Sequence, residues 1–202
     1  METDAKRGLV KYAKPAGVIA SLIPMTNPAM TPPVTGVSSA NARNAVIFSP
    51  HPRTAATTCE MSRIMRAACH AVGAPEDLFQ CIERPSIPMT QYLMESCDLT
   101  LATGGKPMVQ AAYSSGKPAY GVGAGNSTIV VDETANLNEA AKNIMISKTS
   151  DFGSGCSADG NIVIQKSIYS NMVSELQANN GYLCNSAEKE LLSRAMWDNN
   201  SF

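Results

Sequence analysis

Short apolar runs rich in β-branched residues alternate with longer helix-forming segments along this chain. The first run, residues 17–23, stops at Pro24, and the second, residues 44–48, ends before Ser49. Apolar runs of this length predict buried strands, and the longer segments between them predict crossover helices. We therefore expect an α/β fold with a doubly wound parallel sheet, in which helices cover both faces.

The same pattern continues to the end of the chain. Gly73 and Pro75 end the second predicted helix, and Pro107 suits the first turn of the fourth, where a backbone N–H is not needed. The remaining predicted strands cover residues 78–82, 99–102, 118–121, 128–132 and 162–164, the last of them buried. The predicted helices cover residues 29–42, 55–72, 89–96, 107–115, 136–146, 167–179 and 186–197.

Charge and composition limit the possible partners. The 202 residues include 16 basic and 17 acidic side chains without a basic cluster, so we expect neither nucleic acid nor a membrane surface as a partner. The charged N-terminus precedes no long apolar run, and we expect no signal peptide or membrane-spanning segment. A small-molecule partner and a cytoplasmic location are the predictions.

The cysteines do not form a metal-binding pattern. There are six cysteines without a C-x-x-C pair and only two histidines, so no metal site is expected. Cys59, Cys69, Cys81 and Cys97 lie in apolar stretches, and we interpret them as reduced thiols of the core.

Cys156 stands apart from the other cysteines. It is flanked by Gly153, Gly155 and Gly160 and precedes the predicted strand at residues 162–164. Small neighbours leave room for a substrate and for free backbone N–H groups, which a nucleophile with an oxyanion site requires. The alternative is a buried thiol that acts as a small apolar side chain.

Three loops follow predicted strands and carry groups that could bind a ligand. The Thr103-Gly104-Gly105 turn opens a helix, where N–H groups can bind phosphate, although it does not match G-x-G-x-x-G. Residues 49–54 offer a hydroxyl, an imidazole and a guanidinium to a ribose or phosphate, or form a stiff surface turn. Asn27, between two prolines, could donate to an oxyanion or shape the loop as an Asx-turn.

Five segments follow one another along the chain: PMTNP (24–28), NAVIFSPHPR (44–53), ATGG (102–105), GVGAGN (121–126) and KTSDFGSGC (148–156). Taken in this order, they resemble the aldehyde dehydrogenase superfamily and specifically its CoA-acylating branch, of the sulfoacetaldehyde and acetaldehyde dehydrogenase types. The resemblance runs from about residue 12 to residue 197 and covers less than half of the family unit. It implies a Rossmann-like dinucleotide-binding domain at residues 1–146, without its N-terminal part, and the first part of a catalytic domain at residues 147–202. A homo-oligomer is expected for the complete unit.

The resemblance also implies the chemistry. Cys156 would attack a small aldehyde, with the oxyanion held by the Asn27 amide and the Cys156 N–H. Hydride would pass to NAD or NADP, and the acyl group would remain on Cys156 as a thioester. His51 and Arg53 leave the choice between NAD and NADP open. The residues implied in cofactor binding are Thr26, Ser49, Pro50, His51, Arg53, Thr103, Gly104, Gly105, Gly121, Val122 and Gly123.

Gly121 determines which molecule is expected to receive the acyl group. Hydrolytic members of the superfamily have a glutamate there that activates water, whereas glycine has no side chain to act as a base. The resemblance therefore implies coenzyme A as the second substrate and disfavours a hydrolytic enzyme. The competing interpretation is a catalytically incomplete fragment that acts at most as a nucleotide-binding module.

Overall fold

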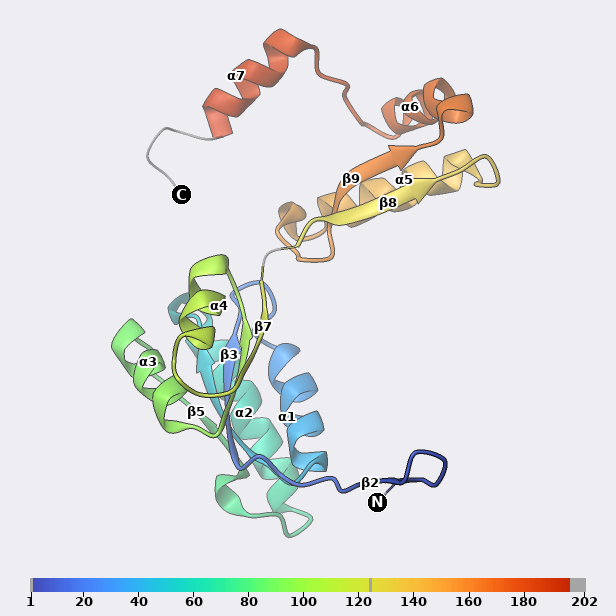
Figure 1. The fold of residues 1–202 in the computed structure, drawn as a ribbon. Coiled ribbons are helices and arrows are strands. Elements are labelled where there is room, and N and C mark those ends of the chain that lie inside the picture. Colours follow the sequence, from blue (N-terminus) through green and yellow to red (C-terminus); the bar gives the residue numbers. More distant parts are fainter. Residues whose placement is uncertain (1, 124, 197–202) are drawn as a thin grey trace. The chain divides into compact units, whose positions relative to one another are not determined.

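The computed structural model describes residues 2–123 and 125–196 (Figure 1). The chain divides into two compact units, residues 1–124 and 125–202, and each is described by itself. The predicted functional boundary after residue 146 stays a prediction. The predicted end of the last helix, Trp197, lies outside the described residues.

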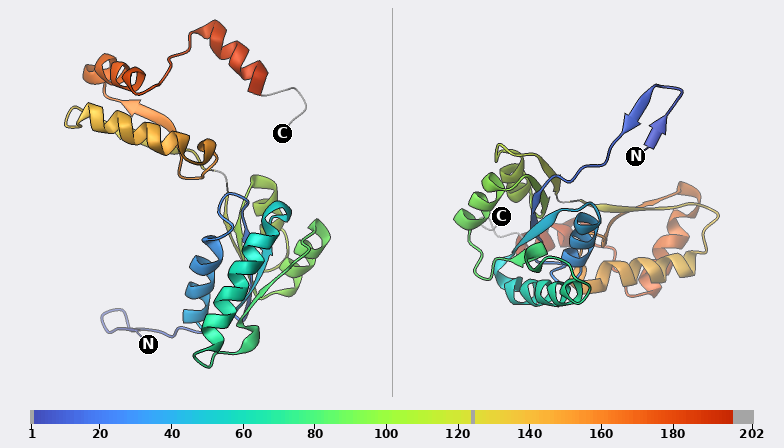
Figure 2. Two further views of the ribbon diagram at one scale, coloured as in Figure 1. Left: turned by 180° about the vertical axis from the view of Figure 1, so that it is seen from behind. Right: turned by 90° about the horizontal axis from the view of Figure 1, so that it is seen from below.

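A five-stranded parallel sheet forms the centre of the first unit, with strand order β5-β4-β3-β6-β7 (Figures 1 and 2). The doubly wound parallel sheet predicted from the apolar runs is thus confirmed. Its strands are β3 (Val18–Ile23), β4 (Ala45–Pro50), β5 (Phe79–Cys81), β6 (Leu99–Thr103) and β7 (Ala119–Val122). The connecting helices are α1 (Thr31–Asn41), α2 (Ala55–His70), α3 (Ile87–Ser96) and α4 (Lys106–Tyr113), with 3-10 turns η1 (Pro52–Thr54) and η2 (Glu76–Leu78).

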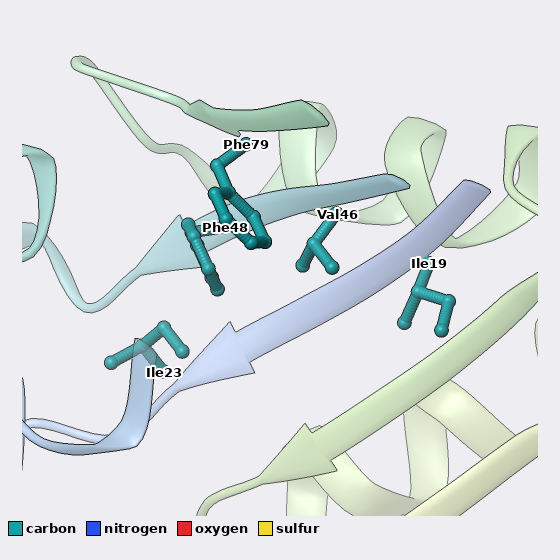
Figure 3. Packing of buried hydrophobic residues seen from close by; sticks show 5 residues of the cluster. All are labelled: Ile19, Ile23, Val46, Phe48 and Phe79. Carbon is teal, nitrogen blue, oxygen red and sulfur yellow. The ribbon is translucent and has the colours of Figure 1, made fainter. Parts of the chain in front are cut away.

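Alternate residues of the central strand β3 pack on opposite faces of this sheet. Ile19 and Ile23 join a core with Val46, Phe48 and Phe79, shown in Figure 3, which α1 and α2 cover. The other face packs against α3 and α4. There, Leu22 joins Met94, Ala102 and Ala112, while Ala20 contacts Leu93 and Cys97. Because the sheet is buried on both faces, its strands are continuous apolar runs in the sequence.

Asn44 connects three segments at the start of β4. Its side chain is buried, and Oδ1 accepts hydrogen bonds from the N–H groups of Ala16 (2.6 Å) and Gly17 (3.0 Å). Its Nδ2 donates to the carbonyl oxygens of Ser39 and Ala42, each at 3.2 Å. The amide therefore satisfies four backbone groups, a role that the sequence pattern does not indicate.

Replacing Asn44 with alanine should lower the free energy of unfolding by about 2–3 kcal/mol, because buried backbone groups lose their partners. Urea denaturation followed by circular dichroism measures the change. The control is Asn41→Ala at an exposed site, expected to change stability by less than about 0.5 kcal/mol. Equal effects of the two substitutions would contradict this role of the buried amide.

An antiparallel hairpin of β1 (Glu2–Asp4) and β2 (Leu9–Lys11) precedes the sheet and was not predicted. Its strands are short, and Leu9 and Val10 are 51% and 47% exposed. Two adjacent apolar residues between Gly8 and Lys11 give neither a run nor an alternation, so the sequence carries no strand signal here.

The second unit packs helices against a two-stranded parallel sheet of β8 (Ser127–Val131) and β9 (Asp159–Ile164). Ile162 and Ile164 pack on its core, but Val163 is 53% exposed, so the prediction of a fully buried strand was wrong at this residue. Helices α5 (Leu137–Thr149) and α6 (Tyr169–Ala178) pack on one face of the pair, whereas α7 (Ser186–Met196) has no buried residue. The 3-10 turns of this unit are η3 (Ser150–Gly153) and η4 (Lys166–Ile168). The core is Val131, Ala141, Ile144 and Met172.

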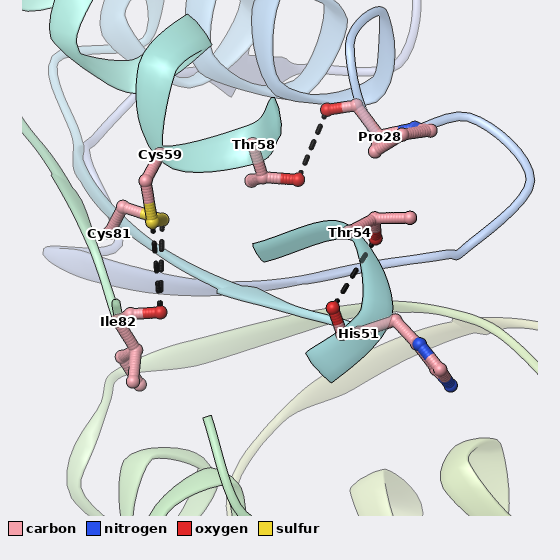
Figure 4. Close-up of a disulfide and its surroundings, with 7 residues drawn as sticks. All are labelled: Pro28, His51, Thr54, Thr58, Cys59, Cys81 and Ile82. Atoms are coloured by element: carbon pink, nitrogen blue, oxygen red, sulfur yellow. Dashed lines mark hydrogen bonds between the residues drawn. A yellow bond between two sulfur atoms is a disulfide. The ribbon is translucent and has the colours of Figure 1, made fainter. Parts of the chain in front are cut away.

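Cys59 and Cys81 form a disulfide that joins α2 to β5 (Figure 4). The prediction that all four early cysteines are reduced was therefore wrong for this pair, whereas Cys69 and Cys97 are free. The packing of α2 beside β5 brings the two Cα atoms within 5.3 Å, although 22 positions separate them in sequence. This proximity is a property of the tertiary fold, and no local spacing motif signals it.

Two negative findings apply to the described part of the chain. No helix there is long and apolar enough to cross a membrane. No group of three or more histidine, cysteine, aspartate or glutamate side chains there is arranged to hold a metal ion.

Candidate active site

The loops predicted to bind a nucleotide all follow the carboxyl ends of strands in the parallel sheet. Strands β3 and β6 are neighbours, yet the chain continues from β3 to β4 on one side and from β6 to β7 on the other. This is a topological switch point, where doubly wound sheets bind their ligands. The Thr26–Asn27 segment and the Thr103–Gly105 turn follow the two strands that meet there, so the fold brings two predicted segments to one place.

Asn27 is exposed, and its side-chain oxygen accepts a hydrogen bond from the Met30 N–H at 3.3 Å. The oxygen therefore shapes the loop, as the alternative interpretation held, although the contact spans three residues rather than the two of an Asx-turn. In the described residues the amide nitrogen of Asn27 donates no hydrogen bond and is open to a ligand. Because the hydrogen bond holds the amide oxygen within the loop, the amide nitrogen faces outward. Asn27 can therefore shape the loop and donate to a ligand at the same time.

The loop after β4 presents only some of its predicted groups. Ser49 is 3% exposed, and its hydroxyl shares a hydrogen bond with the Thr90 hydroxyl of α3 at 2.9 Å. Pro50 is buried as well. His51 and Arg53 are exposed, and the His51 Nδ1 accepts from the Arg53 N–H at 3.2 Å. The imidazole and guanidinium are thus the side chains of this loop that are open to a nucleotide, while the Ser49 hydroxyl is engaged within the fold.

The turn after β6 is attached to the next strand and is open on its other side. The Gly104 N–H donates to the Val122 carbonyl of β7 at 3.1 Å, and Gly105 precedes the first turn of α4. A Cβ at Gly105 would come no closer than 3.7 Å to Pro107 Cδ. Protein packing therefore does not require this glycine. The open space and the positive end of the α4 dipole fit an anionic group such as a phosphate.

Gly121, in contrast, is enclosed by side chains of α4. A Cβ there would lie 2.5 Å from Val109 Cγ1 and 2.9 Å from Tyr113 Cε2. The Gly121 N–H also donates to the Tyr113 hydroxyl oxygen at 3.0 Å. A larger residue would displace Val109 and Tyr113. Sequence reasoning identified the glycine but missed the tyrosine, because no sequence spacing indicates that the two residues meet. Val122 at the end of β7 and Gly123, which follows it, are exposed.

Cys156 lies in the loop between η3 and β9 and is exposed. The alternative interpretation, a buried thiol, is therefore excluded. The φ angles of Asp151, Phe152 and Gly153 are +48°, +54° and +74°, so the loop turns sharply before the cysteine. Of the three glycines that flank Cys156, only Gly153 needs the freedom of a glycine at positive φ.

A serine not identified from the sequence stabilises this loop. Ser154 Oγ is hydrogen-bonded to the Asp151 carbonyl oxygen (2.7 Å) and to its Oδ2 (2.8 Å). Within residues 2–123 and 125–196 the Cys156 N–H donates to no protein group, so it is free to donate to an oxyanion. The second unit thus combines an accessible thiol with a free N–H at the same residue.

Comparison with known proteins establishes the family. The model of the aldehyde dehydrogenase family matches residues 1–184. This chain belongs to the aldehyde dehydrogenase family.

Relatives of this family member include acylating and acetylating aldehyde dehydrogenases, as the motifs predicted. It is 43% identical over 201 residues to the sulfoacetaldehyde dehydrogenase of an Acholeplasma species. It is 42% identical to a solved acetylating aldehyde dehydrogenase from Geobacillus thermoglucosidasius, with a TM-score of 0.86 over 94% of this chain. The chain spans 41% of the first protein and 42% of the second. The prediction of the acylating branch is confirmed.

Two further solved relatives of this aldehyde dehydrogenase chain hold ligands. A propionaldehyde dehydrogenase from Rhodopseudomonas palustris contains CoA and an acylated cysteine; it is 34% identical, with a TM-score of 0.78, over 91% of this chain and 42% of that protein. An engineered glycolyl-CoA reductase contains NADP+; it is 34% identical, with a TM-score of 0.82, over 92% of this chain and 43% of that protein. Homologous proteins thus use the cofactor and the co-substrate predicted from the sequence.

Proposed function

We propose that this chain supplies the nucleotide-binding unit and the acyl-carrying cysteine of a CoA-acylating aldehyde dehydrogenase. The observation that carries the proposal is the environment of Gly121. Val109 and Tyr113 occupy the space that a side chain would need, so no carboxylate at this position can activate water. The thioester on Cys156 therefore requires a thiol acceptor, and relatives of the chain bind CoA.

The reaction begins at the exposed Cys156. Its thiolate adds to the carbonyl carbon of a small aldehyde, and the Cys156 N–H and the Asn27 amide nitrogen donate to the resulting oxyanion. NAD or NADP, when bound, accepts the hydride that leaves this carbon. The acyl group then remains on Cys156 as a thioester. The CoA thiolate attacks this thioester and Cys156 leaves as a thiolate, giving acyl-CoA.

The cofactor is assigned to the loops at the switch point. Gly105 binds the phosphates through its backbone N–H group, and Thr103 and Gly104 complete the turn, in which the Gly104 N–H is bonded to Val122. His51 and Arg53 face the adenosine ribose. Thr26, Ser49, Pro50, Gly121, Val122 and Gly123 complete the proposed cofactor site, with Ser49 and Pro50 contributing backbone atoms because both are buried. Arg53 is exposed and accommodates a 2′-phosphate, so the site fits NADP as well as NAD. Sulfoacetaldehyde and acetaldehyde are the proposed substrates.

The proposal extends to location and partners. A cytoplasmic enzyme has access to both CoA and nicotinamide nucleotides. The balanced charge of 16 basic and 17 acidic residues fits an enzyme of small molecules rather than a protein that binds nucleic acid or a membrane surface. A homo-oligomer is proposed for the complete family unit.

The decisive experiment measures the reduction of NAD and NADP by the purified chain with acetaldehyde or sulfoacetaldehyde, with and without CoA. The proposal predicts nucleotide reduction and acyl-CoA formation that both depend on CoA. Rapid formation of the free acid without CoA would identify a hydrolytic enzyme instead. Nucleotide binding without turnover would support the competing interpretation, a nucleotide-binding module.

Replacing Gly121 with glutamate should not create a hydrolytic enzyme. The new Cβ would contact Val109 and Tyr113, so we expect a loss of about 1–3 kcal/mol in stability and no gain in hydrolysis. The matched control is Gly123→Glu, because the nearest atom to a Cβ there, Val109 Cγ2, is 4.0 Å away. Thermal unfolding and acid release measure the two effects. A stable Gly121→Glu variant that releases acid rapidly would refute the assignment.

A further inference from the structure

A hollow of about 330 Å³ lies between α2 and β5 in the first unit, away from the switch point. The disulfide between Cys59 and Cys81 forms part of its wall. Its lining residues are Ala56, Cys59, Glu60, Ser62, Arg63, Arg66, Cys81 and Glu83. None of them has a role in the proposed reaction.

Ser62 indicates that this hollow accommodates a ligand. The residue is 2% exposed and lines the hollow, and its Oγ has no hydrogen-bond partner within the described residues. Buried hydroxyl groups almost always have a partner, because an unpaired one loses the hydrogen bonds that it made to water. A polar group bound in the hollow would supply the missing hydrogen bond.

The charges around the hollow are of both signs. Arg63 is paired with Glu60 at 2.6 and 2.8 Å. The Arg66 Nε donates to the Glu76 carbonyl oxygen at 3.2 Å, and its guanidinium lies 3.9 Å from the exposed Glu76 carboxylate. The Glu83 side chain is exposed. A ligand with a carboxylate and an ammonium group matches this wall better than a simple anion, since Arg66 and Glu83 offer it opposite charges.

We propose that this hollow binds a small zwitterionic thiol of the amino-acid type, which exchanges with the Cys59–Cys81 disulfide. The thiolate of the ligand attacks one sulfur, the bond between the two cysteines breaks, and a mixed disulfide forms. The other cysteine leaves as a thiolate and takes up the proton released by the incoming thiol. The step is balanced and needs no further oxidant or reductant.

The surroundings of the disulfide accommodate the product of this step. The Ile82 carbonyl oxygen lies 3.8 Å from the Cys59 sulfur and 4.0 Å from the Cys81 sulfur (Figure 4). Whichever cysteine is released, its S–H can therefore donate to this oxygen without a shift of the backbone. The carbonyl group therefore stabilises the state in which the disulfide is broken, whether Cys59 or Cys81 is the released thiol.

The exchange would act on segments assigned to the active site. Thr58, beside Cys59, donates from Oγ1 to the Pro28 carbonyl oxygen at 3.1 Å, and Pro28 follows Asn27 (Figure 4). The 3-10 turn η1, which follows His51, leads directly into α2. Breaking the disulfide removes the covalent link between α2 and β5. Because the start of α2 adjoins both loops, the exchange regulates the loops that carry Asn27 and His51. This consequence rests on the proposed function, whereas the exchange itself does not.

The test uses the whole 202-residue chain with its disulfide formed, incubated with reduced glutathione in oxygen-free buffer. Without an oxidant, a thiol can add only to an existing disulfide, so Cys69, Cys97, Cys156 and Cys184 stay unmodified. Peptide mass spectrometry should find one adduct, on Cys59 or Cys81. Its rate of formation should saturate with the glutathione concentration, whereas the uncharged 2-mercaptoethanol should give a linear dependence.

Variants separate binding from simple chemical reactivity. Ser62→Ala and Arg66→Ala should each raise the half-saturating glutathione concentration about tenfold, as expected for the loss of one hydrogen bond to a charged group. Arg84→Ala, an exposed residue outside the hollow, is the control and should have no effect. If one variant is misfolded by circular dichroism, the other still decides the question.

Several outcomes would overturn the proposal. They are a chain that forms no disulfide between Cys59 and Cys81 on oxidation, an adduct on neither residue, and a linear rate with glutathione. An unchanged half-saturation in a folded Ser62→Ala or Arg66→Ala variant would also overturn it. None of these measurements uses an aldehyde, a nucleotide or CoA, so their failure is distinct from failure of the proposed enzyme activity.

Discussion

Replacing Cys156 with alanine should reduce aldehyde- and CoA-dependent nucleotide reduction by at least about three orders of magnitude, because the acyl group loses its point of attachment. The effect should be on turnover, since the side chain lies outside the loops assigned to the nucleotide. Nucleotide fluorescence titration should therefore give the same dissociation constant for both proteins.

A second measurement isolates the thioester. Incubation with acetyl-CoA in the absence of nucleotide should acetylate Cys156, and mass spectrometry of peptides would locate the group. The matched control is Cys184→Ala, a free and partly buried thiol in the same unit, which should keep full turnover and acylation. Acylation of another cysteine, or normal turnover without Cys156, would remove the basis of the mechanism.

Replacing Phe48 with alanine should lower the free energy of unfolding of the first unit by about 3–5 kcal/mol. The ring is fully buried and stacks on Phe79 with a centroid distance of 6.2 Å. Its removal would leave a cavity between β4 and the helices that cover it, because a sheet packed on both faces cannot collapse into the space.

The comparison for this prediction is Tyr92→Ala on α3, which also removes an aromatic ring but from a side chain that is 68% exposed. We expect this change to stay within about 0.5 kcal/mol. Denaturant unfolding monitored by circular dichroism, with a separate probe for each unit, measures both. Similar midpoints for the two variants would show that the Phe48 cluster is not the main core.

The central sheet could be predicted from the sequence because a strand that is buried on both faces is a continuous apolar run. The run at residues 17–23 became β3, and the run at residues 44–48 became β4, which extends to Pro50. The helix predicted at residues 107–115 is α4, which begins one residue earlier and ends two residues earlier, at Tyr113. Each of these elements depends on the pattern of its own residues, so a single sequence is sufficient.

Features that depend on contacts between distant residues were not predictable. The Asn44 amide, the Tyr113 hydroxyl on the Gly121 N–H and the disulfide of Cys59 all require the packed tertiary structure. Burial of the Ser49 hydroxyl against α3 belongs to the same class. The site residues themselves stay predictions, and the two units carry different parts of them.

In the part of the second unit that the structure describes, both strands of the sheet are edge strands. In the described residues, β8 and β9 pair with each other alone, so the outer N–H and C=O groups of both strands have no strand partner. Such groups are a template for an incoming strand, and Val130 and Val163 add apolar side chains that are 74% and 53% exposed. During expression this unit should therefore be the part of the chain most prone to aggregate, and lysine in place of Val163 should improve its solubility.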